Sequence, residues 1–280
     1  MISFFKILTQ NHEISGHLIV YGVISAGEKI FKPRTGSKGN IISKCVYLGV
    51  TTTTVPVNRK EDIMDKSIDK FWKTRLADLK TALDSNNFQA FVAENTDEAK
   101  KIVLEKIIPD IAPKSVSWGG SLTFTATGLY DMLKKRSELN VLDTFEKKLS
   151  PQESLERRRQ SLLVDLFITG SNAVTETGQL VNLDMIGNRI GGITFGPKHV
   201  IVLAGRNKIV PDLDAAMFRI KNYAAPVNTM RLHKKTPCAK TSYCEECKSP
   251  DRICNTWTIT EKSFPKGRVK VVLSNDDLGF

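Results

Sequence analysis

The sequence has no long apolar run and, at its start, no pattern typical of a secretory leader. Its two apolar patches near the start are interrupted by Lys6 and by Glu13 with His17, whereas a membrane-spanning helix needs about 18 consecutive apolar residues. The N-terminus also lacks the order of basic, then apolar, then small residues that marks a secretory signal. We therefore expect a cytoplasmic protein without a membrane segment.

Aromatic residues are missing from the stretches where positive charge is densest. The chain has a formal net charge of +11, but its Lys and Arg residues are spread along it, and the basic patches at 157–159 and 231–235 contain no Phe, Trp or Tyr that could stack on a base. This argues against nucleic acid as a partner and leaves a small anionic metabolite as the expected one. We interpret the first patch as a solvated helix face.

Cysteines are too few and too clustered for a secreted disulfide scaffold. Four of the five lie between residues 238 and 254 with the spacing C-x5-C-x2-C-x6-C, whose central pair suits metal binding. Zinc, an iron–sulfur cluster, a redox disulfide and unligated thiols all remain open. His233 is an alternative ligand, and Cys45 is assigned no role. The candidate metal ligands are Cys238, Cys244, Cys247 and Cys254.

Residues 1–63 show no sustained periodicity, which predicts a poorly structured N-terminal extension. From Met64 onward, apolar residues recur at helical spacing, so a compact domain is expected over residues 64–280, including the cysteine-rich segment at 233–256. One hypothesis makes Met64 the natural initiator, which the intact mass of protein from its native locus would test. The predicted apolar stripe consists of Ile68, Phe71, Trp72, Leu76, Leu79 and Leu83.

Short strand-like segments alternate with helical ones in the rest of the chain. The run at 199–204 is continuously apolar, as in a strand buried on both faces of a parallel sheet. The alternation predicts an α/β fold with an open, mostly parallel sheet and flanking helices, which binds ligands at the carboxyl ends of its strands. The predicted strands are 115–118, 139–142, 166–169, 179–183, 199–204 and 269–273.

A glycine turn joins the first of these strands to a predicted helix. Free backbone N–H groups and the helix dipole favour a phosphate or carboxylate at such a turn, although tight turns also use glycine for steric reasons alone. The candidate anion-binding residues here are Gly119, Gly120 and Ser121.

The segment 169–178 is interpreted as a long polar loop between two strands. Glu176 is its only carboxylate and therefore the candidate catalytic acid, base or nucleophile. The alternative is a turn residue that accepts hydrogen bonds from the amides of its own loop.

Two further polar segments follow predicted strands. Asn188 and Arg189 come after 179–183, where Arg189 either binds an anion bidentately or pairs with Asp184. Asn207 and Lys208 follow 199–204, either as ligand-binding residues or as an ordinary strand-to-helix turn.

Several of these segments, taken together and in order, resemble the lactate-utilisation (LUD, DUF162) family. The C-terminal cysteine segment with 249–254, followed by the Leu-Gly-Phe ending, is similar to a stand-alone branch of that family. The segments that carry the resemblance are 118–121, 170–178, 187–189, 196–198 and 205–210.

The resemblance implies a fold like that of the NagB, ribose-phosphate isomerase and CoA-transferase superfamily. It also implies a link to the oxidation of L-lactate to pyruvate beside iron–sulfur partner proteins. CoA transferases of this superfamily use a glutamate nucleophile, which Glu176 matches in kind. Because class I CoA transferases build their site from two such domains, thioester chemistry would require this chain to form a homodimer.

The leading hypothesis is an accessory or subunit protein of lactate or related 2-hydroxy-acid oxidation, with a metal centre on the four clustered cysteines. It predicts one anion pocket lined by Gly120, Ser121, Glu176, Asn188 and Arg189. The alternatives are an acyl/CoA-transferase-like or phosphosugar enzyme that uses Glu176, and a non-catalytic regulator that binds a small molecule.

Overall fold

The computed structural model describes residues 11–14, 17–20 and 59–280. The chain divides into two compact units, Met1–Lys66 and Ser67–Phe280. In the first, β1 (Asn11–Ile14) pairs antiparallel with β2 (His17–Val20). Most of the extension predicted at 1–63, including Cys45, lies outside the described residues.

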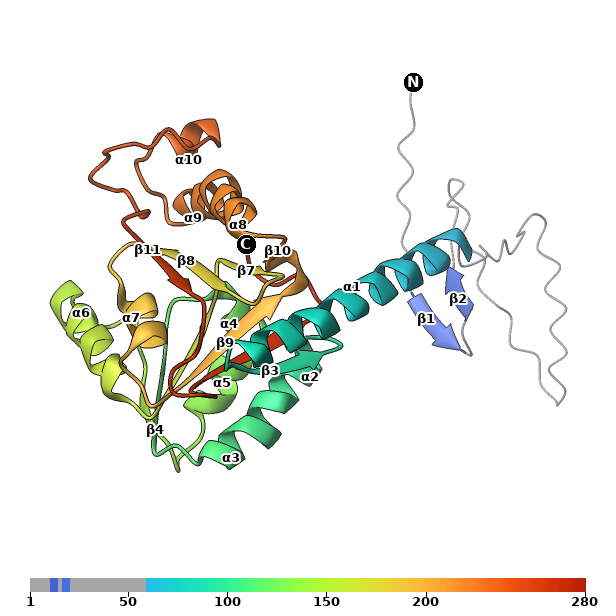
Figure 1. Ribbon diagram of the computed structural model, residues 1–280, viewed down its shortest axis with the longest axis horizontal. Coiled ribbons are helices and arrows are strands. Elements are labelled where there is room, and N and C mark those ends of the chain that lie inside the picture. Colours follow the sequence, from blue (N-terminus) through green and yellow to red (C-terminus); the bar gives the residue numbers. More distant parts are fainter. Residues whose placement is uncertain (1–10, 15–16, 21–58) are drawn as a thin grey trace, which may run out of the picture. The chain divides into compact units, whose positions relative to one another are not determined.

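The larger unit is built on a six-stranded sheet in which every pairing is parallel. This confirms the predicted α/β fold with its open parallel sheet (Figure 1). The final strand, expected at 269–273, is Val269–Ser274, and it lies inside the sheet between the strands Gln89–Ala93 and His199–Gly205. The strand order is β3 (Gln89–Ala93), β12 (Val269–Ser274), β9 (His199–Gly205), β6 (Leu166–Gly170), β4 (Ser115–Trp118) and β5 (Asn140–Leu142).

Alternate residues of the central strands enter two separate cores, because successive side chains of a strand point to opposite faces. Ile201 and Leu203 of β9 join one core, and Val200 and Val202 join the other. Helices cover both faces, which explains why β9 is apolar throughout. The first core is covered by α2 (Thr96–Lys101), η1 (Ile102–Ile107), α3 (Ile108–Ile111), α4 (Leu122–Ala126) and α5 (Leu129–Lys134).

The opposite core receives the apolar stripe of α1 (Arg59–Ser85), together with Ile193 of α7 (Asn188–Thr194). Only the C-terminal half of the predicted stripe is buried: Leu76, Leu79 and Leu83 are at most 1% exposed, whereas Ile68 is 41% and Phe71 50% exposed. The helix also begins before Met64, at Arg59. Periodicity therefore located the helix but could not say how much of it reaches the sheet.

A second, four-stranded sheet was not predicted. Its order is β10 (Ile209–Val210), β7 (Ala173–Thr175), β8 (Leu180–Asp184) and β11 (Thr256–Thr260). The segment 169–178, expected to be a polar loop, therefore contains a short buried strand. A run of three residues is too short for its alternation to be recognised among hydroxyl-bearing neighbours.

The remaining helices follow local signals in the sequence. A capping box of Ser150 and Glu153, a pattern that the sequence itself displays, starts α6 (Pro151–Gln160), which continues into η2 (Ser161–Leu163). The other helices of this region are η3 (Arg206–Lys208), α8 (Leu213–Arg219), η4 (Ile220–Ala224), α9 (Ala225–Arg231) and α10 (Cys238–Thr241).

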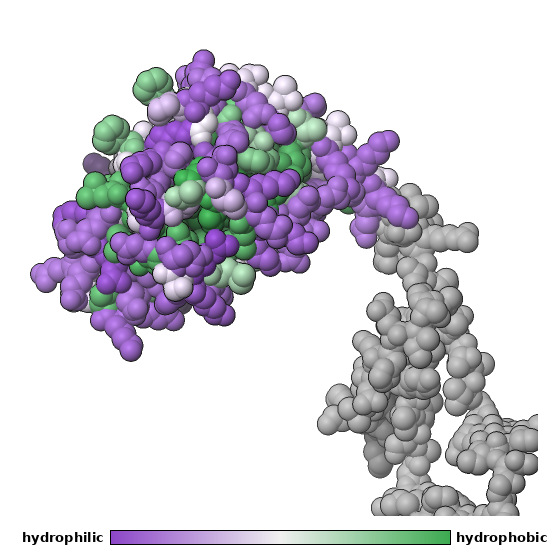
Figure 2. Space-filling model, turned by 90° about the horizontal axis from the view of Figure 1, so that it is seen from below, coloured by the Kyte–Doolittle hydropathy of each residue, from purple (hydrophilic) through white to green (hydrophobic). Residues whose placement is uncertain are grey.

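Polar side chains cover most of the surface seen in Figure 2, with smaller apolar patches between them. Among the described residues, no helix combines the length and the apolar character that crossing a membrane requires.

The unequal burial along α1 makes a first prediction. Leu79→Ala is expected to lower the free energy of unfolding by about 2–5 kcal/mol because it leaves a cavity in the core. Ile68→Ala, on the exposed half of the same helix, should cost about 0.5 kcal/mol or less. Denaturant unfolding of both variants measures the difference, and equal losses would contradict the described packing.

Candidate functional site

A cavity of about 690 Å³ lies at the carboxyl ends of the central strands. Strands β4 and β6 are neighbours in the large sheet. The next strand of this sheet after β4 in the chain is β5, which lies on one side of the pair, and the next after β6 is β9, which lies on the other side. Adjacent strands whose connections diverge leave a crevice between them, and open α/β sheets bind ligands there. The residues that follow β4, β5, β6 and β9 and line the cavity are Gly120, Ser121, Thr144, Phe145, Ser171, Asn172 and Lys208.

The side chains that line this cavity are either cationic or apolar over much of its wall. Five are basic and only one is acidic, Asp184. A carboxylate or phosphate would therefore enter a positive environment, while an apolar group could contact the rest of the wall. The basic residues are Arg158, Arg189, Lys208, Arg231 and Lys234, and the larger apolar ones are Leu122, Phe145, Leu183, Met185, Ile186, Ile220, Leu232, Ile253 and Phe280.

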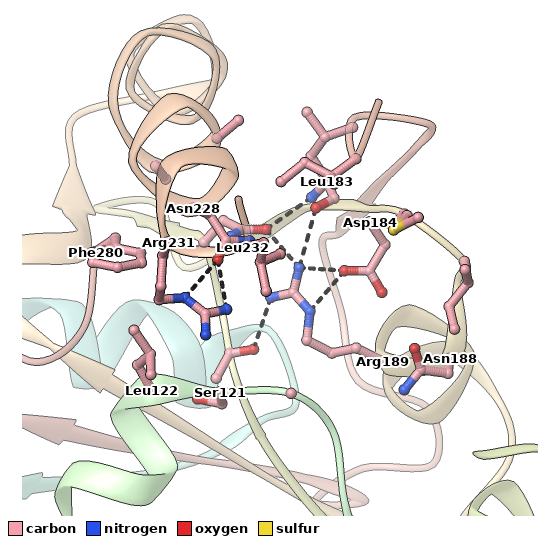
Figure 3. Close-up of a pocket in the computed structure, with 18 of the residues that line it drawn as sticks. Ser121, Leu122, Leu183, Asp184, Asn188, Arg189, Asn228, Arg231, Leu232 and Phe280 are labelled. Carbon is pink, nitrogen blue, oxygen red and sulfur yellow. Dashed lines mark hydrogen bonds and ion pairs between the residues drawn. The ribbon is translucent and has the colours of Figure 1, made fainter. Parts of the chain in front are cut away.

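Arg189 is the most heavily bonded of these cations (Figure 3). From α7 its Nε donates to Asp184 Oδ1 at 2.8 Å, and its two terminal nitrogens donate to Asn182 Oδ1 at 2.8 Å and Asn172 Oδ1 at 2.6 Å. It also donates to Gly170 O at 3.2 Å. Protein acceptors thus occupy the donors that a bound anion would need, and the ion pair with Asp184, foreseen as the alternative, is formed.

Lys208 is the most buried cation of the cavity and has no carboxylate partner among the described residues. It is 6% exposed, and its Nζ donates to Thr123 Oγ1 at 2.6 Å. Burial, with smaller contributions from the nearby positive charges of Arg189 and Arg219, lowers the pKa of Lys208 to about 7. Near neutral pH, a substantial fraction of this side chain is therefore the free amine.

The other predicted anion-binding residues have different surroundings. Gly120, Ser121 and Asn188 line the cavity. Ser121 also caps α4, since its hydroxyl accepts from Phe124 N at 3.1 Å. Gly119 does not line the cavity; a Cβ there would stand 2.9 Å from Thr169 Oγ1, so glycine is required for packing.

Asn207 also lies outside the cavity lining, although it directly precedes Lys208. It accepts from Leu278 N at 3.0 Å and donates to Gly279 O at 3.1 Å, which fastens the C-terminal segment. In a 3₁₀ turn, consecutive side chains point about 120° apart. This separates Asn207 from its neighbour.

Glu176 is not part of the cavity, which corrects the expected grouping of five residues in one pocket. Its carboxylate pairs with Arg75 of α1 at 2.9 Å, and Asn86 donates to the carbonyl oxygen of Thr177 at 2.9 Å. The turn that follows strand β7 therefore lies against α1 and the residue that follows it. The separation follows from the second sheet, which the sequence did not predict.

The four clustered cysteines line one second, smaller cavity of about 20 Å³. All four are free thiols. Arg252 closes the segment around them by donating to Cys247 O at 2.7 Å and Cys254 O at 2.8 Å. Burial raises the pKa of Cys254 to about 11. His233 is not among the residues that line this cavity.

The ligand set suits a thiolate-bound metal, but its geometry does not close around one ion. In the part of the chain that the structure describes, no three His, Cys, Asp or Glu side chains are placed to hold a metal. The cavity has room for about one water molecule. Ile253 and Cys254 line this cavity and the larger one, so the two share a wall.

Three basic residues that line the cavity were not predicted as site residues, although the sequence shows both of their segments, 157–159 and 231–235, as basic patches. Arg158 lines the cavity, whereas its neighbour Arg157 donates to Asp143 O at 3.1 Å and Arg159 pairs with Glu156 at 3.2 Å. The solvated-face interpretation of 157–159 did not foresee that Arg158 lines the cavity. Arg231 and Lys234 come from the second patch.

Comparison with known families now places the chain. The LUD domain model matches residues 76–274, which include the six-stranded sheet, the cysteine segment and all the residues that line the cavity except Phe280. The chain belongs to the LUD domain family. This confirms the family resemblance stated from the sequence. None of the curated proteins matches it.

Two solved structures give weaker matches. One is a DUF162 family protein from Deinococcus radiodurans, 14% identical, over 73% of this chain and 98% of that one, with a TM-score of 0.42. The other is ribose 5-phosphate isomerase from Plasmodium falciparum, 16% identical, over 41% of this LUD-domain chain and 54% of that one, with a TM-score of 0.25.

The bonding of Arg189 makes a second prediction. Arg189→Lys keeps the positive charge, but one ammonium group cannot reach all the acceptors that the planar guanidinium now bonds. The free energy of unfolding should therefore fall by about 3 kcal/mol. Arg206→Lys is the control, because Arg206 forms a single ion pair with the exposed Asp277 and should cost about 1 kcal/mol or less. If denaturant unfolding gave a loss for Arg189→Lys as small as that for Arg206→Lys, the network would not be essential.

Proposed function

We propose that this LUD-domain protein is an accessory or subunit of cytoplasmic lactate or other 2-hydroxy-acid oxidation, and that it binds the organic acid in the 690 Å³ cavity. The charge of the cavity wall carries the proposal. Five basic side chains face one acidic side chain, and that one is already paired with Arg189. The site therefore keeps a net positive charge for an anionic ligand.

The distribution of these groups suits an organic acid better than an inorganic anion. Arg158, Arg231 and Lys234 supply cations around the wall, and apolar residues such as Leu232 and Phe280 lie among them. Arg231 donates to Asn228 Oδ1, a neutral acceptor, so its charge is not cancelled by that bond (Figure 3). A carboxylate would lie against the cations while a hydrocarbon side chain contacts the apolar wall.

The volume indicates the size of the ligand. A cavity of about 690 Å³ lies in the upper half of the range for ligand sites and far exceeds a three-carbon acid. We therefore extend the proposed ligands from lactate and pyruvate to 2-hydroxy and 2-oxo acids with longer apolar side chains. Glu176 lies outside the cavity, so the proposal gives it no role.

The four cysteines are the second part of the proposal. We infer that they form a metal centre beside the acid site, because all four thiols line one cavity that shares Ile253 and Cys254 with the larger one. Thiolates suit zinc or iron–sulfur clusters. Closing on a metal would require the segment around 244–247 to rearrange, since no three ligands are placed around one point in the described residues.

Binding of the acid is tested with L-lactate, pyruvate and 4-methyl-2-oxopentanoate by calorimetry. Arg158→Gln should raise the dissociation constant about tenfold, because one charge-assisted contact is lost. Arg159→Gln is the matched control on the same helix, since Arg159 does not line the cavity, and it should leave binding unchanged. Equal effects of the two substitutions, or no binding of any acid to the wild type, would overturn the acid site.

The metal centre is tested on protein purified without oxygen. We expect bound iron or zinc near one centre per chain, with absorbance near 400 nm if the metal is an iron–sulfur cluster. Cys247→Ser should lose most of the metal, because a serine hydroxyl is a poor ligand for a soft ion. Metal-free, colourless wild-type protein would remove this part of the proposal and leave the acid site standing.

A further inference from the structure

Lys208 lines the cavity and is buried, but among the described residues it has no carboxylate partner of the kind that a buried lysine ordinarily has. Its Nζ is held by the hydroxyl of Thr123, which in turn donates to Leu278 O at 3.1 Å. No carboxylate lies within ion-pairing distance of it among the described residues, and Arg189, itself buried, adds positive charge nearby. A buried ammonium in this setting would be uncompensated.

These surroundings favour the unprotonated amine. Burial disfavours the charged form, and neighbouring cations act in the same direction. The lowered pKa of Lys208, about 7, agrees with this placement. A desolvated lysine beside other cations is the kind of amine that attacks carbonyl carbons.

We propose that Lys208 forms an imine with the carbonyl carbon of a 2-oxo acid bound in the cavity. The inference rests on the proposed acid site and specifies its chemistry. The Nζ lone pair attacks the carbonyl carbon, and the carbonyl oxygen leaves as water with the two protons of the amine. One C=N bond replaces one C=O bond, nothing is oxidised or reduced, and no co-reactant is required.

The cavity supplies what this step requires. Arg231 and Lys234 offer cations for the carboxylate of the acid, and Thr123 holds the amine through a 2.6 Å hydrogen bond. A 2-hydroxy acid has no carbonyl carbon next to its carboxylate and cannot form the imine. Lys208 therefore gives the protein a means to distinguish the oxidised acid from the reduced one.

The full-length protein is incubated with pyruvate or 4-methyl-2-oxopentanoate and sodium cyanoborohydride, which reduces an imine to a stable amine. We expect one adduct per chain by intact mass, located at Lys208 by peptide mapping, and none with L-lactate. Lys270 is the internal control, because it is also buried with a lowered pKa but does not line the cavity, and it should stay unmodified.

Two further measurements sharpen the test. The initial rate of adduct formation, divided by that of a free lysine derivative treated in parallel, should fall about tenfold from pH 6 to pH 8, because the unprotonated fraction rises about tenfold for Lys208 but about a hundredfold for an ordinary lysine. Lys208→Arg should abolish the adduct; because mapping locates the adduct in the wild type, the test does not depend on that variant folding.

The outcomes separate the two proposals. An adduct at Lys208 supports the imine. Binding of 2-oxo acids without an adduct, or an adduct spread over exposed lysines, overturns the imine and leaves the acid site intact. If calorimetry finds no binding and mass spectrometry no adduct, both proposals are wrong.

Discussion

The guanidinium of Arg189 joins the two sheets of the protein. It donates to Gly170 at the end of β6 in the large sheet, and to Asn182 and Asp184 of β8 in the small sheet. Asn172, in the connection between them, accepts a further bond. Because the group is buried and its acceptors come from three segments of the chain, the floor of the cavity keeps one arrangement only while this network is complete.

The cavity also concentrates charge that is dispersed in the sequence. Arg158 comes from α6, Lys208 from the end of β9, and Arg231 from α9. An overall charge of +11 says little about function by itself. Four cations and the partly protonated Lys208, gathered around one paired carboxylate at the ends of parallel strands, are more specific, because they give an anion a defined place.

The cysteine segment belongs to the same region of the molecule. Ile253 and Cys254 form part of the wall of both cavities. A change at the thiols, whether oxidation or metal binding, would therefore alter a surface that faces the proposed ligand. The two candidate centres can therefore influence each other through Ile253 and Cys254, which line both cavities.

Local sequence determined the elements whose causes are local. The cap at Ser150, the apolar run of β9 and the helix that carries Leu79 follow from side-chain pattern. The ion pair of Arg189 with Asp184 was foreseen as the alternative to anion binding. The family resemblance likewise rested on short segments in a fixed order.

Only the tertiary structure decided which of these segments meet. Glu176, which follows the three-residue strand β7, pairs with Arg75 of α1 and does not line the cavity that Gly120 lines, although both had been assigned to one pocket. Arg158 and Arg231 converge for the same reason: their directions depend on how two sheets and their helices pack. The side-chain pattern within a segment determines whether it forms a helix or a strand and where a helix is capped. The position of a side chain in space is determined by contacts between residues far apart in the chain.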